Sequence, residues 1–164
     1  MAVGPVRTFT LAEAARLTGL ERSRIHFWCA AWGAGLVKPE EEGGPGRPKR
    51  LSERQLVQVA VIPHLIAARL SLEQIAGLFS HAEPEWWDLA AAVAQNPAFL
   101  DWIVVVWDAR QAPLWFLLSS AYEAAGVGAG AWAGLQQLVD RVPGFRSFQV
   151  IELSHLKRAL LARW

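Results

Sequence analysis

The chain has 164 residues, 53% of them apolar, and a net charge of +1 from 16 Lys and Arg against 15 Asp and Glu. This apolar content excludes disorder of the whole chain, and the length allows one ordinary domain or two small ones. A single cysteine, Cys29, excludes an intramolecular disulfide framework and a multi-cysteine zinc site. It also fits a reducing compartment, so we expect a cytoplasmic protein.

The charges are unevenly distributed along the chain. Residues 1–80 hold ten basic and seven acidic side chains, whereas residues 81–164 hold six basic and eight acidic ones. Such an asymmetry predicts that the first half meets a polyanion and that the second half has a different task.

One segment, residues 111–139, is long and apolar enough to raise the question of a membrane span, with Glu123 as its single charged residue. It also contains a proline, two serines and four glycines, and a central acidic residue costs about 2.5 to 3.5 kcal/mol on insertion. We therefore expect no membrane span and no membrane partner.

Residues 1–10 lack an apolar run, which predicts no signal peptide.

Residues 10–32 predict two short helices joined at a glycine. Thr10 and Glu13 have the spacing of a capping box, so the first helix should begin at Leu11, and Gly19 is suited to end it. The apolar stripe of the second helix comprises Ile25, Trp28, Cys29 and Trp32. Its other face carries Arg22, Ser23, Arg24 and His26. This order is typical of a helix-turn-helix, whose second helix enters the DNA major groove; the alternative is a helical hairpin with a solvated basic face.

A glycine- and proline-rich stretch, residues 40–50, follows the two helices and predicts a flexible tip with a basic strip. Capping boxes then predict a third helix after Ser52 and a fourth after Ser71. Because an internal proline costs about 3 kcal/mol, we expect a kink or break of the third helix before Pro63. The whole order predicts a mainly α winged helix-turn-helix over residues 8–80. The cations of its wing, residues 43–51, are Arg47, Lys49 and Arg50.

Within about residues 8–79, five segments follow one another in a recognisable order: Phe9–Leu20, Ile25–Trp28, Gly35–Pro39, Gly46–Ser52 and Leu70–Ile75. Together they resemble the MerR family of bacterial transcriptional regulators. The resemblance implies binding of double-stranded promoter DNA through a recognition helix, residues 21–32, and through the wing. The residues that it places at the DNA are Arg22, Ser23, Arg24, His26, Arg47, Lys49 and Arg50, with Thr10 and Arg16 near the DNA backbone. One such module buries only roughly 600 to 1,000 Å² of its surface, which favours a homodimer on two half-sites.

The second half predicts a small α+β domain after a short helical linker, residues 81–96. Pro84 and Pro97 bound the linker, so a long dimerising coiled coil is not expected. Within residues 97–164 we expect a β-hairpin of strands 102–107 and 114–118, helices at 121–126 and 131–140, a third strand at 147–153 and a final helix at 154–164.

Seven of the nine tryptophans lie in residues 86–164. Three interpretations stay open for them: large rings that fill a small core, a dimer interface, or a pocket for a small-molecule or protein effector. The residues expected at an effector or dimer interface are Trp102, Trp107, Trp115, Glu123 and Trp132. Glu123 is either a counter-ion for a cationic effector or an exposed helix residue.

The sequence gives little support for a catalytic site or a metal site. His26 and Cys29 have helical spacing, but Cys29 falls on the apolar stripe, so a buried thiol is expected rather than a metal ligand. No nucleophile, base and acid can be assembled, so we expect no enzyme, no metal and no cofactor. The leading hypothesis is a DNA-binding transcription regulator; the alternative is an antitoxin-like or phage-type adaptor that uses a winged-helix fold to hold a partner protein.

Overall fold

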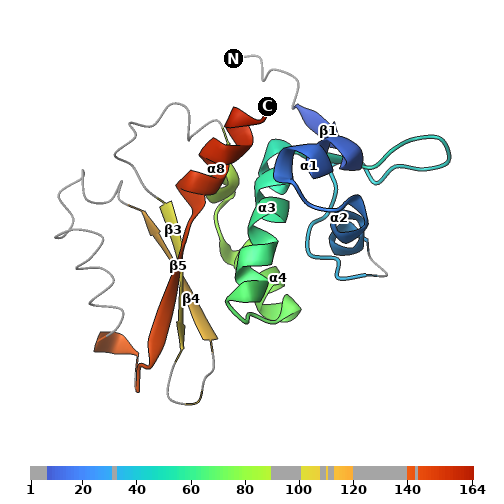
Figure 1. Cartoon of the computed structure of the whole chain (residues 1–164). Coiled ribbons are helices and arrows are strands. Elements are labelled where there is room, and N and C mark those ends of the chain that lie inside the picture. The colour runs from blue at the N-terminus through green and yellow to red at the C-terminus, as the bar shows by residue number, and fades with distance from the viewer. Residues whose placement is uncertain are drawn as a thin grey trace.

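The computed structural model describes residues 7–30, 33–89, 101–107, 110, 113–119, 140–142 and 144–164. Helices dominate the described residues up to 89, and a three-stranded sheet followed by one helix makes up most of the described residues after it. Figure 1 shows α3 at the centre, with α1 and α2 on one side and the sheet β3–β5 on the other. The expected helical N-terminal region and strand-containing C-terminal region with a final helix are therefore confirmed.

The helix starts follow the predicted capping boxes. Helix α1 is Leu11–Thr18, α2 is Arg22–Cys29, α3 is Glu53–Ala67 and α4 is Leu72–His81. The side chains of Thr10, Ser52 and Ser71 each accept a hydrogen bond from the third residue of the helix that follows, and that residue's side chain bonds back to the cap. Gly19 ends α1 with a φ of 75°, where a side chain is disfavoured.

Two three-residue strands pair within the helical region, one before α1 and one before α3. Strand β1, Thr8–Thr10, pairs antiparallel with β2, Arg50–Ser52, and Phe9 lies opposite Leu51. Both of these apolar residues are buried. Because the pairing is antiparallel, the start of α1 lies beside Arg50 and the start of α3 lies beside Thr8.

The structure bears on two expectations about the helical region. The expected break of α3 before Pro63 is wrong, because the helix continues to Ala67. A proline at this position removes one helical N–H, yet Val59, Ile62 and Leu65 are fully buried, and their burial outweighs the lost bond. Of the expected helical linker, the structure describes a single 3₁₀ turn, η1 at Pro84–Trp87, which is followed by extended backbone at Asp88. Residues 90–96 lie outside the described part.

The C-terminal region is built on an antiparallel sheet with the strand order β4-β3-β5. Strand β3 is Asp101–Trp107, β4 is Pro113–Ser119, β5 is Ser147–Glu152, and helix α8, Leu153–Ala162, follows β5 directly. The expected hairpin, third strand and final helix are confirmed. The expected helices at 121–126 and 131–140 lie, apart from residue 140, outside the described residues, as does most of the apolar segment 111–139.

The main apolar core spans both regions of the chain. It includes residues of α1 to α4, together with Ile103 and Val105 of β3 and Leu153 and Leu160 of α8. A second, smaller cluster on the opposite face of β3 contains Val104, Val106 and Val142. The division into 8–80, 81–96 and 97–164 stays a prediction. Over the ranges that the structure describes, the helices are too short or too polar to cross a membrane.

Candidate functional site

The corner between α1 and α2 presents polar side chains on one face and buries the other. Arg22, Ser23 and Arg24 of α2 are exposed and His26 is half-buried. The expected apolar stripe is buried at Ile25, Trp28 and Cys29, whereas Trp32 lies outside the described residues. Helix α2 ends at Cys29, three residues before the expected end.

Residues 41–50 form a β-hairpin. Backbone hydrogen bonds join Glu41 to Arg50 in both directions, at 3.2 and 3.0 Å, and Gly44 to Arg47, at 3.0 and 2.9 Å. Gly43 has a φ of 76°, and a Cβ there would lie 2.8 Å from the Arg47 carbonyl oxygen. Only glycine allows this close approach of the two arms.

The side chain of Gln55 holds the base of the hairpin. Its Oε1 accepts hydrogen bonds from the backbone N–H groups of Ser52, at 2.8 Å, and Glu40, at 3.0 Å. Its Nε2 donates to the carbonyl of Lys38 at 2.6 Å. The capping box identifies Gln55 from sequence, but its bonds to residues 15 and 17 positions earlier carry no local signal.

The three hairpin cations are held differently. Arg47 is exposed, and no side-chain partner is found for it within the described ranges. Lys49 lies 3.2 Å from Glu42. The Arg50 guanidinium donates to the Thr8 hydroxyl at 2.8 Å and to the Thr8 carbonyl at 3.3 Å. Arg50 thus ties the hairpin to β1, whereas Arg47 faces solvent.

A groove of about 410 Å³ lies between α2, the start of α1 and the hairpin. It is lined by Thr10, Leu11, Ala12, Arg22, His26, Pro48 and Lys49. Figure 1 shows α2 and the hairpin on the same side of the molecule, away from the sheet β3–β5. The structure therefore brings together four residues that sequence singled out, from three separate segments. The other three lining residues were not foreseen.

The remaining expected DNA-binding residues lie outside this groove. Ser23, Arg24 and Arg47 are exposed beside it. The Arg16 guanidinium donates to the carbonyl of Arg163 at 3.3 Å, at the end of α8. Arg16 therefore joins the two ends of the described chain as well as facing solvent.

Two groups near the groove have shifted pKa values, Glu13 through hydrogen bonds and Cys29 through burial. The backbone N–H and the hydroxyl of Thr10 donate to Glu13, at 2.7 and 2.9 Å, and lower the pKa of its carboxyl group. Burial raises the pKa of the Cys29 thiol to about 11. The expected buried thiol is thus confirmed. Within the described ranges, groups of three or more His, Cys, Asp or Glu residues suited to a metal ion are not found.

The residues expected at an effector or dimer interface do not form one cluster. Trp107 and Trp115 pack against the main core, while Trp102 packs against the smaller cluster on the other face of the sheet. Glu123 and Trp132 lie outside the described residues.

Residues 9–82 match the family model described as MerR HTH family regulatory protein. The resemblance is thereby confirmed for the N-terminal segment, which contains α1 to α4, the hairpin and the groove. A comparison with curated proteins gives no match.

Proposed function

Because residues 9–82 match the MerR helix-turn-helix regulatory family, we propose that the protein is a transcription regulator that binds duplex DNA through α2 and the 41–50 hairpin. The observation that carries this proposal is the shared groove, in which Arg22 and His26 of α2 meet Lys49 of the hairpin. In the proposed complex α2 is the recognition helix and lies in the major groove. The hairpin is the wing and follows the adjacent DNA backbone.

Phosphate contacts supply most of the affinity in this proposal, since arginine and lysine displace condensed counterions from DNA. Arg22, Arg24 and Arg47 are exposed cations for which no side-chain partner is found in the described part of the chain. They need not give up an ion pair to meet a phosphate. Ser23 and His26 are placed to approach base edges, because the first turns of the recognition helix contact the bases.

Thr10 supports the surface through its position at the start of α1. Its hydroxyl belongs to the capping box, where it accepts from the Glu13 N–H at 3.2 Å. Leu11 and Ala12, the first two residues of α1, line the groove, and a helix N-terminus favours an anion such as phosphate. Arg50 holds Thr8 and so also positions β1 beside the groove.

A homodimer completes the proposal. A single module of this size buries little surface on DNA, and two copies on two half-sites double the number of phosphate contacts. Light scattering of the purified protein measures its mass in solution, with and without DNA. A protein that stays monomeric in both conditions contradicts this part of the proposal.

The direct test is electrophoretic retardation of a pool of duplex fragments over a range of salt concentrations. We expect retardation at about 50 mM salt and a linear fall of log affinity with log salt. Lys49→Ala should lower the slope by about one unit. Arg158→Ala in α8 is the matched control, because Arg158 pairs with Glu152 far along the chain from the groove.

Two outcomes contradict DNA binding. One is the absence of retardation of any fragment at low salt. The other is equal salt slopes for the Lys49 and Arg158 variants. A stoichiometric partner protein that is captured from the host without enriched DNA instead supports the adaptor function.

A further inference from the structure

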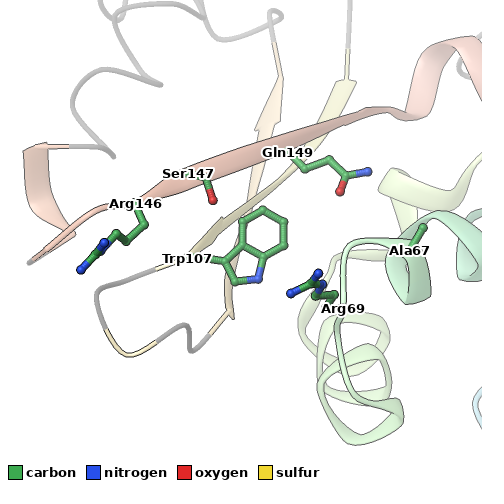
Figure 2. A pocket seen from close by; sticks show the side chains of 6 residues that line it. All are labelled: Ala67, Arg69, Trp107, Arg146, Ser147 and Gln149. Atoms are coloured by element: carbon green, nitrogen blue, oxygen red, sulfur yellow. The ribbon is translucent and has the colours of Figure 1, made fainter.

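A second cavity lies between the helical region and the sheet, away from the groove. It has a volume of about 430 Å³ and is lined by Ala67, Arg69, Trp107, Arg146, Ser147 and Gln149. Figure 2 shows the Trp107 ring with β5 on one side and the turn between α3 and α4 on the other. Its volume falls in the range of small-molecule sites, about 300 to 1,000 Å³, although the pocket is open to solvent, since Ala67, Arg69, Arg146 and Ser147 are exposed.

The charge of the lining is positive. Arg69 and Arg146 are the ionisable residues among the described residues that line it, and none of these described residues is acidic. Within the described part of the chain, no ion pair or side-chain hydrogen bond is found for either guanidinium. Two such cations beside one cavity favour an anionic ligand, because a guanidinium binds carboxylate or phosphate through paired hydrogen bonds.

The backbone at Arg69 is strained. Its φ is 58°, and it is the single residue other than glycine with a positive φ among those described. This left-handed conformation ends α3, with the Leu70 N–H bonded to the Leu65 carbonyl at 3.1 Å, and it costs an ordinary side chain roughly 1 to 2 kcal/mol. The turn directs the Arg69 guanidinium toward the indole of Trp107 (Figure 2).

The rest of the lining supplies a flat surface and neutral polar groups. Trp107 is half-buried, with part of its ring packed against the main core. Ser147 and Gln149 are both on the face of β5 that adjoins Trp107, since Trp107 pairs with Ser147 across the strands. A planar ligand stacks on an indole ring, while a hydroxyl and an amide donate to or accept from its polar edge.

We propose that this cavity binds a flat organic anion, in which an aromatic or heteroaromatic ring stacks on Trp107 and an acidic group pairs with Arg69. Arg146, Ser147 and Gln149 close the opposite side of the site. Helix α3 extends from this cavity to β2, next to the groove, so the ligand binds at the far end of the helix that supports the proposed DNA surface. Binding of the ligand does not depend on the proposed function.

Calorimetric titration of the full chain with naphthoate, a planar aromatic carboxylate, tests the proposal. We expect saturable binding to a single site per chain at concentrations up to about 1 mM. Naphthamide, which has the ring without the charge, and inorganic phosphate, which has the charge without the ring, should each bind about tenfold more weakly. Cyclohexane carboxylate has the charge and an apolar ring that is not aromatic, so its affinity separates stacking on Trp107 from general apolar contact.

Two variants link the binding to the cavity. Arg69→Gly should weaken naphthoate binding about tenfold, while its thermal midpoint stays at least as high as that of the wild type, because glycine relieves the positive φ. Trp107→Leu should weaken binding roughly three- to tenfold. Arg158→Gln, an exposed arginine outside the cavity, should bind naphthoate as the wild type does.

The proposal is overturned if naphthoate does not bind, or if Arg69→Gly binds it as tightly as the Arg158 control. Equal affinity for naphthamide and naphthoate also overturns it, because charge recognition is then absent. Binding of inorganic phosphate alone would show an anion site without stacking and would contradict the role of Trp107. Since Arg69→Gly should fold at least as well as the wild type, its loss of binding cannot be assigned to unfolding.

Discussion

Two ion pairs, one in the helical region and one in the sheet region, have similar distances and very different surroundings. In the hairpin, Lys49 Nζ lies 3.2 Å from Glu42. In the sheet region, Lys157 Nζ lies 3.5 Å from Asp101. The hairpin side chains are 23% and 59% exposed, whereas those of the second pair are 1% and 11% exposed. An exposed pair contributes about 0 to 1 kcal/mol to stability, and a buried charge without its partner is far more costly.

The surroundings of the buried pair explain this difference. Burial lowers the pKa of Lys157, while the carboxylates of Asp101 and, to a smaller extent, Asp88 raise it. The Asp101 N–H also donates to the Ser154 hydroxyl at 2.7 Å, which ties β3 to α8. The buried pair of Lys157 and Asp101 thus helps to hold the fold, whereas the pair of Lys49 and Glu42 is open to solvent.

The largest effect is expected at the buried pair. Lys157→Ala should lower the free energy of unfolding by about 3 to 5 kcal/mol, because Asp101 is left buried without its counter-charge. Urea unfolding measures the change. The double variant Lys157→Met, Asp101→Asn should recover most of the loss, since no uncompensated charge remains. If Lys157→Ala costs less than about 1 kcal/mol, burial does not distinguish the two pairs.

The next effect concerns pH and the buried thiol of the helical region. The pKa of Cys29 is about 11 in the folded chain against an ordinary value of 9.0. Between these values the unfolded chain loses the thiol proton while the folded chain keeps it, so stability falls as pH rises through this window. At pH 11 the wild type should have lost about 2 kcal/mol more than Cys29→Ala, relative to pH 8. Parallel curves for the two proteins would show that the thiol ionises as easily when folded.

Removing one helix cap should cost less. Ser71→Ala deletes the side chain that accepts from the Gln74 N–H at 3.2 Å and should lower the free energy of unfolding by about 1 kcal/mol. Ser80→Ala is the matched control, because Ser80 bonds within α4 to the Ala76 carbonyl and does not cap a helix. The control should change stability by less than about 0.5 kcal/mol. Equal losses would mean that capping does not set the start of α4.

The smallest change in stability, and the sharpest contrast with the buried pair, is expected in the hairpin. Glu42→Gln frees Lys49 and should change the free energy of unfolding by less than about 0.5 kcal/mol. DNA affinity at low salt should nevertheless rise a few-fold, because a negative charge near the phosphates is removed. Fluorescence anisotropy of a labelled duplex measures this. Glu85→Gln in η1 is the control and should leave DNA affinity unchanged.

Local signals predicted the helical region well. The three capping boxes and Gly19 fix helix starts and ends through bonds between residues three or four apart, so a sequence window contains all the partners. The strand runs in the second half were equally visible as β-branched and aromatic stretches. The prediction that α3 breaks before Pro63 was wrong. Elements distant in sequence bury this helix, and their packing overrides helix propensity.

Contacts between residues that are distant in the chain could not be predicted from the sequence. Strands β1 and β2 have three residues each and show no periodicity, yet their pairing places Thr10 at the groove. The groove itself needs Arg22 and Lys49 side by side, which only the hairpin fold achieves. In the second cavity, Trp107 was noticed as a residue type, but nothing local associates Arg69 with Arg146 across 76 intervening residues.

The docking of α8 has a consequence for synthesis on the ribosome. Leu153 and Leu160 of this helix belong to the same core as Leu17 of α1, and the Arg163 guanidinium donates to the Leu17 carbonyl at 3.3 Å. A nascent chain that has emerged only as far as residue 89 therefore still exposes apolar surface that α8 later covers. The helical region, although encoded first, therefore completes its native packing only after α8 has been synthesised, and its apolar surface is open to aggregation until then.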